Sequence, residues 1–205
     1  MVKEILIYIE GDTKKGNANA VTLRRGFSEF FKNLAGEINI PIKPVMGGGR
    51  ETTIKLFLGS LDSYPKGFVI LLVDSDTEID ENETPKSFLQ KISPKFDFSE
   101  VKDEQCHLMV QVMESWFLAD KEKLAEFYGK GFNLKALPKN KEVERIPKDD
   151  VISGLKKATR NTSKKEYGKG LHSGEILQRI DSKKVREAAP HCERLFITIS
   201  KITDG

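Results

Sequence analysis

The sequence predicts an α/β fold with a mainly parallel sheet flanked by helices, and two observations indicate this class. Short apolar segments that suit strands alternate with longer segments in which apolar residues recur at helical spacing. Residues 67–73 (GFVILLV) are apolar at nearly every position, as expected of a central strand buried on both faces. A chain of 205 residues with 38% hydrophobic residues is long enough to enclose such a core.

The first part of the chain supplies the strands of this fold. Apolar runs predict strands at residues 4–10, 38–46, 67–73 and 106–113. Helical spacing predicts helices at residues 19–36, around 54–61, from Pro85 onward and at 114–129. Gly36 is expected to close the first of these helices, because glycine is common just past a helix end.

The pattern changes beyond residue 129. Basic loops punctuated by prolines come first, and helices are then expected around residues 150–160, 174–180 and 192–202. The predicted layout is therefore an α/β core over residues 1–129 and a basic, mainly helical part over residues 130–205 that packs back on the core.

Composition narrows the class of protein. Cys106 and Cys192 lie far apart and lack any zinc-ligand spacing, so we expect buried thiols in a reducing compartment. The apolar run at residues 5–9 is too short for a signal peptide, and no apolar stretch approaches membrane-spanning length. These features favour a cytoplasmic, soluble protein that does not contact a membrane.

Charge is segregated along the chain although the formal net charge is only +3. Residues 74–104 hold ten acidic and four basic side chains, a net charge of −6, whereas residues 130–170 hold five acidic and twelve basic ones, a net charge of +7. Two solvated surfaces of opposite sign would explain this pattern. The alternative is an acidic metal site beside a basic surface that binds a polyanion.

Acidic residues follow three of the four predicted strands. Glu10 ends the first strand, Asp74 and Asp76 follow the third, and Glu114 follows the fourth. The carboxyl ends of parallel strands meet at one edge of a sheet, so we expect these carboxylates to converge. Crowded carboxylates repel each other unless a cation neutralises them, and Mg²⁺ or Mn²⁺ suits such oxygen ligands.

Several of these residue types also have structural interpretations. An aspartate near a helix start often caps the helix, which would explain Asp12 and Asp120. The acidic residues at 78–83 are most simply an exposed loop. The glycines Gly47–Gly49 form a turn, or else their amides and Arg50 contact a nucleic-acid backbone.

The ordered set of segments resembles a known family. A glutamate ending the first strand and a DxD after the third resemble the Toprim fold of topoisomerases, bacterial primases and the OLD and RloB types of nuclease. The segments IEGDTKKG, LVDSD, VQVMESWFLAD, KKEYGKG and PHCERLF together resemble the small stand-alone Toprim-like group, domain-of-unknown-function family 4276. One departure is that such proteins commonly read EG-x-TE, whereas Lys14 replaces the second acid here.

The resemblance implies a Toprim-like Rossmannoid core and a Mg²⁺-dependent endonuclease that hydrolyses the phosphodiesters of DNA or RNA. It assigns metal binding and catalysis to Glu10, Asp74, Asp76 and Glu114. A lysine would stabilise the transition state, with Lys169 the main candidate and Lys165 the second. Nucleic-acid contacts are expected from Arg50, Lys164, Lys165, Lys169 and His172. Similar proteins are encoded beside AAA or SMC-like ATPases in phage-defence cassettes, which implies such a partner.

Two other hypotheses stay open. A receiver-like phosphotransfer domain would also place acids after the first and third strands, but it needs a lysine ending a fifth strand, which the sequence does not show. A docking subunit of an ATPase would retain the acidic cluster without catalysis. The sequence does not decide between DNA and RNA, between one metal and two, or whether a homodimer forms.

Overall fold

The computed structural model describes residues 2–11, 17–64 and 66–202. The strands are β1 (Glu4–Glu10), β2 (Ile42–Gly48), β3 (Gly67–Asp74) and β4 (Cys106–Met109). The α-helices are α1 (Asn17–Phe30), α2 (Lys32–Ile38), α3 (Arg50–Ser60), α4 (Pro85–Ile92), α5 (Glu114–Phe117), α6 (Lys121–Tyr128), α7 (Lys148–Thr159), α8 (Lys169–Leu177), α9 (Ser182–Ala188) and α10 (Pro190–Lys201). Short 3-10 turns are η1 (Asp103–Gln105), η2 (Leu118–Asp120), η3 (Leu134–Ala136) and η4 (Val143–Arg145).

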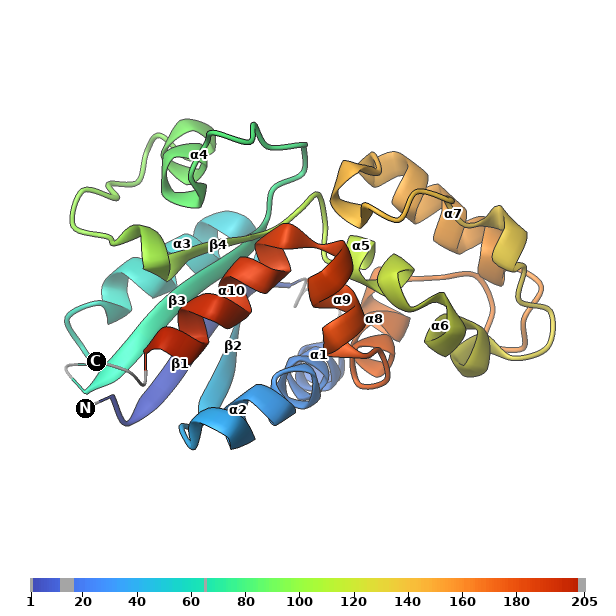
Figure 1. Cartoon of the computed structure of the whole chain (residues 1–205), viewed down its shortest axis with the longest axis horizontal. Helices are drawn as coiled ribbons and strands as arrows, with labels where there is room; N and C mark the ends of the chain where they lie inside the picture. Colours follow the sequence, from blue (N-terminus) through green and yellow to red (C-terminus); the bar gives the residue numbers. More distant parts are fainter. Residues whose placement is uncertain (1, 12–16, 65, 203–205) are drawn as a thin grey trace.

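The described residues form one parallel sheet in the order β2-β1-β3-β4, which confirms the predicted α/β class (Figure 1). The two most apolar strands, β1 and β3, are the central pair. Because all four strands run the same way, their carboxyl ends meet at one edge. Glu10 and Asp74 end neighbouring strands at that edge.

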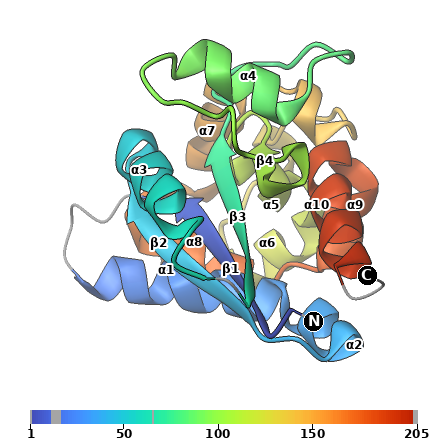
Figure 2. The same cartoon turned by 90° about the vertical axis from the view of Figure 1, so that its left-hand side faces the viewer.

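The alternating side chains of β1 enter two separate apolar clusters. Ile5, Ile7 and Ile9 join a cluster with residues of α1, α2, α5 and α10. Leu6 and Tyr8 face the opposite side and pack with residues of α3 and α4. The sheet is thus covered on both faces (Figure 2), which explains why its central strands are apolar throughout.

Several predicted boundaries differ from those of the structure. The first helix does not close at Gly36: it breaks at Phe31 and resumes as α2. Helix α2 ends at Ile38 and is followed by Asn39, which adopts the left-handed conformation with φ of 52°. The second strand consequently begins at Ile42 rather than at residue 38. The fourth strand ends at Met109, where its pairing with Asp74 ends, rather than at residue 113.

The C-terminal helices pack on the core. Helix α8 crosses α1 at a close approach of Gly174 to Thr22, where an added Cβ would lie 2.4 Å from the Thr22 carbonyl oxygen. Helix α10 returns to β4, and Arg194 donates hydrogen bonds to the Cys106 carbonyl (2.8 Å) and the Asp103 carbonyl (3.0 Å). Helix α9, which was not predicted from the sequence, is capped by Asp181.

The expected boundary at residue 129 lies inside this packing. Phe127 and Tyr128, before the boundary, share one apolar cluster with Leu137 and Val143, after it. No described helix is both long enough and apolar enough to cross a membrane. Cys106 and Cys192 are free and buried, and burial raises the pKa of Cys106 to about 12.

Candidate active site

Glu10 and Asp74 lie side by side at the carboxyl edge of the sheet. The Asp74 amide donates a hydrogen bond to Glu10 Oε2 at 3.3 Å. Asp74 is 5% exposed, whereas the Glu10 side chain is 21% exposed. The two carboxylates therefore differ in their access to solvent although they end adjacent strands.

Glu114 joins this pair from the first residue of α5 and is fully buried. Lys169 bridges it to Asp74: the ammonium lies 3.1 Å from Asp74 Oδ2 and 3.5 Å from Glu114 Oε2. The convergence expected for Glu10, Asp74 and Glu114 is thus present. The Lys169 ammonium, contributed by α8, lies between Asp74 and Glu114, the two more buried of these three carboxylates.

Tyr167 fixes the position of Glu114. Its hydroxyl donates to Glu114 Oε1 at 2.8 Å and lies 2.9 Å from Ser173 Oγ. Tyr167 was not predicted from the sequence, because a tyrosine between lysines does not indicate which buried carboxylate its hydroxyl will contact. Its position in the segment KKEYGKG, two residues before Lys169, was the available signal.

Asp76 lies in a second ionic cluster with Arg50 and Lys148. Both cations form ion pairs with the Asp76 carboxylate. Arg50 also lies 3.4 Å from Glu10 Oε2 and donates to the Asp74 carbonyl at 2.9 Å. Arg50 was expected to contact nucleic acid and Lys148 was not among the predicted site residues; in the structure both pair with Asp76.

The pKa values follow from burial and from these charges. Burial raises the pKa of Asp74 to about 7, and Glu114 and Glu10 add to this effect while Lys169 opposes it. Burial also raises the pKa of Glu10, although Arg50 opposes the rise. Burial alone would raise the pKa of Asp76, but hydrogen bonds from Lys148 and Arg50 outweigh it and hold the pKa below its usual range.

Lys169 remains charged in this setting. Burial favours its neutral form, but the adjacent Asp74 and Glu114 outweigh that effect and raise the pKa of the ammonium above its ordinary value. The described site thus holds negative side chains compensated by protein cations in contact with them.

A model of the family described as "Domain of unknown function (DUF4276)" matches residues 9–200. The chain belongs to the DUF4276 family. No curated protein and no solved structure gave a significant match. The expected membership of family 4276 is confirmed, and the matched range includes every carboxylate and cation of the site.

The other residues expected to contact nucleic acid, Lys164, Lys165 and His172, lie outside the carboxylate cluster. Lys164 lies over the Phe127 ring at 4.6 Å, and Lys165 is exposed with φ of 69°. His172 is buried: its Nδ1 accepts from the Gly168 amide at 3.1 Å and its Nε2 faces the Lys164 carbonyl at 3.2 Å. Both ring nitrogens are engaged by the backbone, which leaves neither to bind a phosphate.

Asp120 has the expected capping role, and Gly47–Gly49 lie where β2 leads into α3. Asp120 caps α6 by accepting from the Lys123 amide at 3.4 Å, and it also accepts from the Asp181 amide at 3.0 Å. Gly47 and Gly48 are the last residues of β2 and Gly49 lies between β2 and α3; a Cβ on Gly47 would lie 2.4 Å from Thr53 Oγ1. Asp12 and Lys14 lie outside the described residues.

The donor set at the sheet edge suits a hard divalent cation. Glu10, Asp74 and Glu114 supply carboxylate oxygens, which Mg²⁺ and Mn²⁺ prefer. Glu114 Oε2 is buried and accepts no hydrogen bond from the described residues. Within the same residues no group of three or more acidic, histidine or cysteine side chains is arranged as a metal cluster. Lys169 pairs with Asp74 and Glu114, and Arg50 pairs with Glu10 and Asp76.

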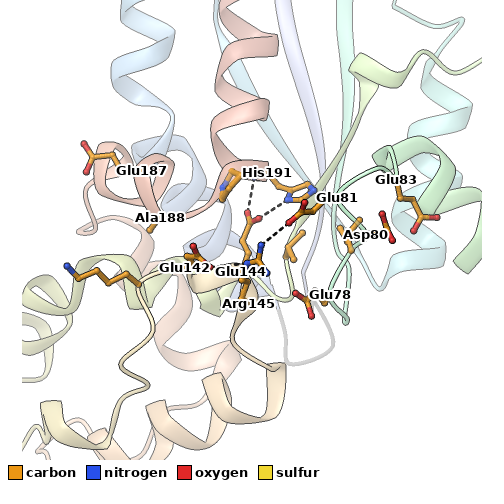
Figure 3. Close-up of a pocket in the computed structure, with 14 residues that line it drawn as sticks. Glu78, Asp80, Glu81, Glu83, Glu142, Glu144, Arg145, Glu187, Ala188 and His191 are labelled. Carbon is orange, nitrogen blue, oxygen red and sulfur yellow. Dashed lines mark hydrogen bonds and ion pairs between the residues drawn. The ribbon is translucent and has the colours of Figure 1, made fainter.

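A separate cavity of about 600 Å³ lies beside the loop that follows β3 (Figure 3). Most of its charged lining is acidic. Glu144 accepts from His191 Nδ1 at 2.7 Å, and Arg145 donates to Glu81 at 2.9 Å. The acidic lining disfavours a polyanion, so nucleic-acid contacts are not expected there.

Proposed function

We propose that this chain is a metal-dependent Toprim-type nuclease that hydrolyses phosphodiesters of DNA or RNA. The observation that carries the proposal is the meeting of Glu10, Asp74 and Glu114 at the carboxyl edge of a parallel sheet, with Lys169 between them. The order of Glu10 at the end of β1 and Asp74-x-Asp76 at the end of the neighbouring β3 supports the Toprim relation.

The carboxylates of Glu10, Asp74 and Glu114 would hold Mg²⁺ or Mn²⁺, with Asp76 a further ligand or a bridge through water. The bound ion would activate a water molecule and stabilise charge on the phosphoryl group. Lys169, with its side chain 43% exposed, is placed to neutralise charge that develops on a phosphate. In the net reaction the water oxygen bonds to phosphorus, one P–O bond breaks, and a proton reaches the departing oxygen.

The basic C-terminal part supports a polyanionic substrate. Lys156, Lys157 and Arg160 are exposed at the end of α7, and Lys148 begins the same helix beside Asp76. A phosphate backbone that contacts this helix would therefore be directed toward the carboxylates.

The proposal also covers the compartment, the biological role and the partner of the protein. The family resemblance supports a cytoplasmic effector of phage defence that works with an AAA or SMC-like ATPase. A docking subunit without catalysis would keep the same partner, so cleavage by the purified chain is the observation that separates the two.

The test is cleavage of plasmid DNA and of total RNA with Mg²⁺ or Mn²⁺. We expect metal-dependent cleavage by the wild type, and loss of at least about 100-fold in rate for Glu10→Gln and Asp74→Asn, which remove ligand charge but preserve shape. Asp62→Asn is the matched control, because Asp62 is an exposed aspartate in the connection preceding β3. Cleavage that persists in both site variants, or no cleavage by the wild type with either metal, would contradict the proposal.

A further inference from the structure

Lys169 occupies the position at which a bound cation would meet two buried carboxylates. Its ammonium is 3.1 Å from Asp74 Oδ2 and 3.5 Å from Glu114 Oε2. Asp74 and Glu114 are 5% and 0% exposed. Burying two carboxylates without a counter-charge would be costly, so the ammonium stabilises this arrangement.

Each carboxylate has one oxygen fixed by the fold and one directed at Lys169. Asp74 Oδ1 accepts from the Met113 amide at 2.8 Å, and Glu114 Oε1 accepts from the Tyr167 hydroxyl at 2.8 Å. The second oxygens, Asp74 Oδ2 and Glu114 Oε2, face the ammonium. Glu114 Oε2 accepts no hydrogen bond from any described residue although it is buried, so it keeps an unused coordination position.

The lysine is attached to the site less firmly than the carboxylates are. Lys169 is the first residue of α8, and its side chain is 43% exposed. The ammonium can therefore move toward solvent while α8 stays packed on α1. The carboxylates have no such freedom, because the backbone and Tyr167 hold them.

We propose that Lys169 is the resident counter-ion of a divalent-cation site formed by Asp74 Oδ2 and Glu114 Oε2, and that Mg²⁺ or Mn²⁺ binds by displacing its ammonium. This inference rests on the proposed function for the identity of the cation. The displaced ammonium remains at the mouth of the site, where it can meet a substrate phosphate. The same side chain thus holds the site together before metal binds and contacts the substrate afterward.

The lysine at a second buried carboxylate serves as a matched comparison. Lys184 lies 2.9 Å from Asp120 Oδ1 and 2.8 Å from Glu122 Oε2. Both Asp120 oxygens also accept backbone hydrogen bonds, from Lys123 and Asp181. Asp120 thus lacks the unused oxygen of Glu114, and we assign no cation site to it.

The experiment is Mn²⁺ binding without nucleic acid, measured by calorimetry and by electron paramagnetic resonance. We expect Lys169→Met to bind Mn²⁺ at least about tenfold more tightly than the wild type, because a competing positive charge is removed. Lys184→Met should bind as the wild type does. Adding Glu114→Gln to Lys169→Met should return the affinity to the wild-type value or below it.

Three results would overturn the inference: equal affinity for Lys169→Met and the wild type, an equal gain for Lys184→Met, or tight binding that survives Glu114→Gln. If circular dichroism shows Lys169→Met to be unfolded, the wild type itself supplies the test. In its lysine-ammonium NMR spectrum, the Lys169 signal should shift on addition of Mg²⁺ and the Lys184 signal should not. An unchanged Lys169 signal at saturating Mg²⁺ would also overturn the inference.

The outcome is distinguishable from that of the proposed function. Metal binding is measured without substrate, so tighter binding by Lys169→Met without nucleic-acid cleavage would keep the cation site and reject the nuclease. Cleavage that depends on Glu10 and Asp74, together with unchanged Mn²⁺ affinity in Lys169→Met, would keep the nuclease and reject the displacement of Lys169 by the cation.

Discussion

His107 is a buried residue on β4 whose two ring nitrogens both have partners. Nδ1 accepts from Arg194 at 3.0 Å, and Nε2 donates to the Glu104 carbonyl at 3.0 Å. An arginine can only donate, so this pair requires the neutral ring with its proton on Nε2. Burial, with a further contribution from Arg194, lowers the pKa of His107 to about 3.

The lowered pKa of His107 makes the stability of the protein depend on pH. The unfolded ring takes up a proton near pH 6.5, while the folded ring does not until about pH 3. The stabilisation is therefore fully present above pH 6.5 and is lost as the pH falls toward 3. Between pH 7.5 and 4.5 the loss should be about 2–3 kcal/mol, because each unit of pKa difference corresponds to about 1.4 kcal/mol.

Urea unfolding of the wild type and of His107→Gln at these two pH values measures the effect. His107→Gln should be less stable than the wild type at pH 7.5 but should lose less stability on acidification. Parallel loss in the two proteins would show that other groups account for the pH dependence.

Among elements, the contact between α8 and α1 determines where Lys169 and Tyr167 lie. A methyl group on Gly174 would sit 2.4 Å from the Thr22 carbonyl oxygen, and backbone cannot move away cheaply. Gly174→Ala should therefore destabilise the protein by about 1–3 kcal/mol, as overpacking does in cores. Thermal unfolding measures the effect.

Gly36→Ala is the matched control for that substitution. Gly36 lies inside α2 with no atom within 4 Å of an added Cβ. Alanine should stabilise the protein by about 0.5–1 kcal/mol here through its higher helix propensity. If Gly174→Ala were as stable as the wild type, the close approach of α8 would not be required for the fold.

Local pattern was sufficient to predict some elements and not others. β1 and β3 are continuous apolar runs between charged residues, so their positions and their terminal acids Glu10 and Asp74 could be read directly. The break at Phe31 could not, because α1 and α2 bury apolar residues with one continuous helical spacing. Their separation depends on packing against the sheet.

The residues that make up the site show the same limit of prediction from local sequence. Strand ends place Glu10 and Asp74 together through topology alone, which sequence order predicts, whereas Glu114 joins them from the start of α5, beyond the end of β4. Tyr167 and Lys148 reach Glu114 and Asp76 from 53 and 72 residues away, from the segment before α8 and from the start of α7, whose docking no local pattern encodes. Arg50 was expected to contact nucleic acid because it follows the glycines Gly47–Gly49; its ion pairs with Glu10 and Asp76 were not predicted, because these partners are likewise distant in sequence.

At the scale of the whole molecule, the segregated charge predicts salt-sensitive binding of nucleic acid. Residues 130–170 carry a net charge of +7. Lys156, Lys157 and Arg160 at the end of α7 are exposed, and none of them forms an ion pair within the described part of the chain. They are therefore available to replace the counter-ions that a phosphate backbone carries.

Replacing all three with alanine should weaken binding and reduce the slope of log affinity against log salt by about 2–3, since each phosphate contact contributes about 0.9 for duplex DNA and about 0.7 for single strands. Alanine at Lys32, Lys43 and Lys91 removes the same charge elsewhere, from exposed lysines that already pair with Glu29, Glu4 and Glu83, and should leave the slope nearly unchanged. Fluorescence anisotropy with labelled oligonucleotides over a salt series measures both slopes. Equal reductions in the two triple variants would mean that net charge alone, rather than the α7 surface, determines binding.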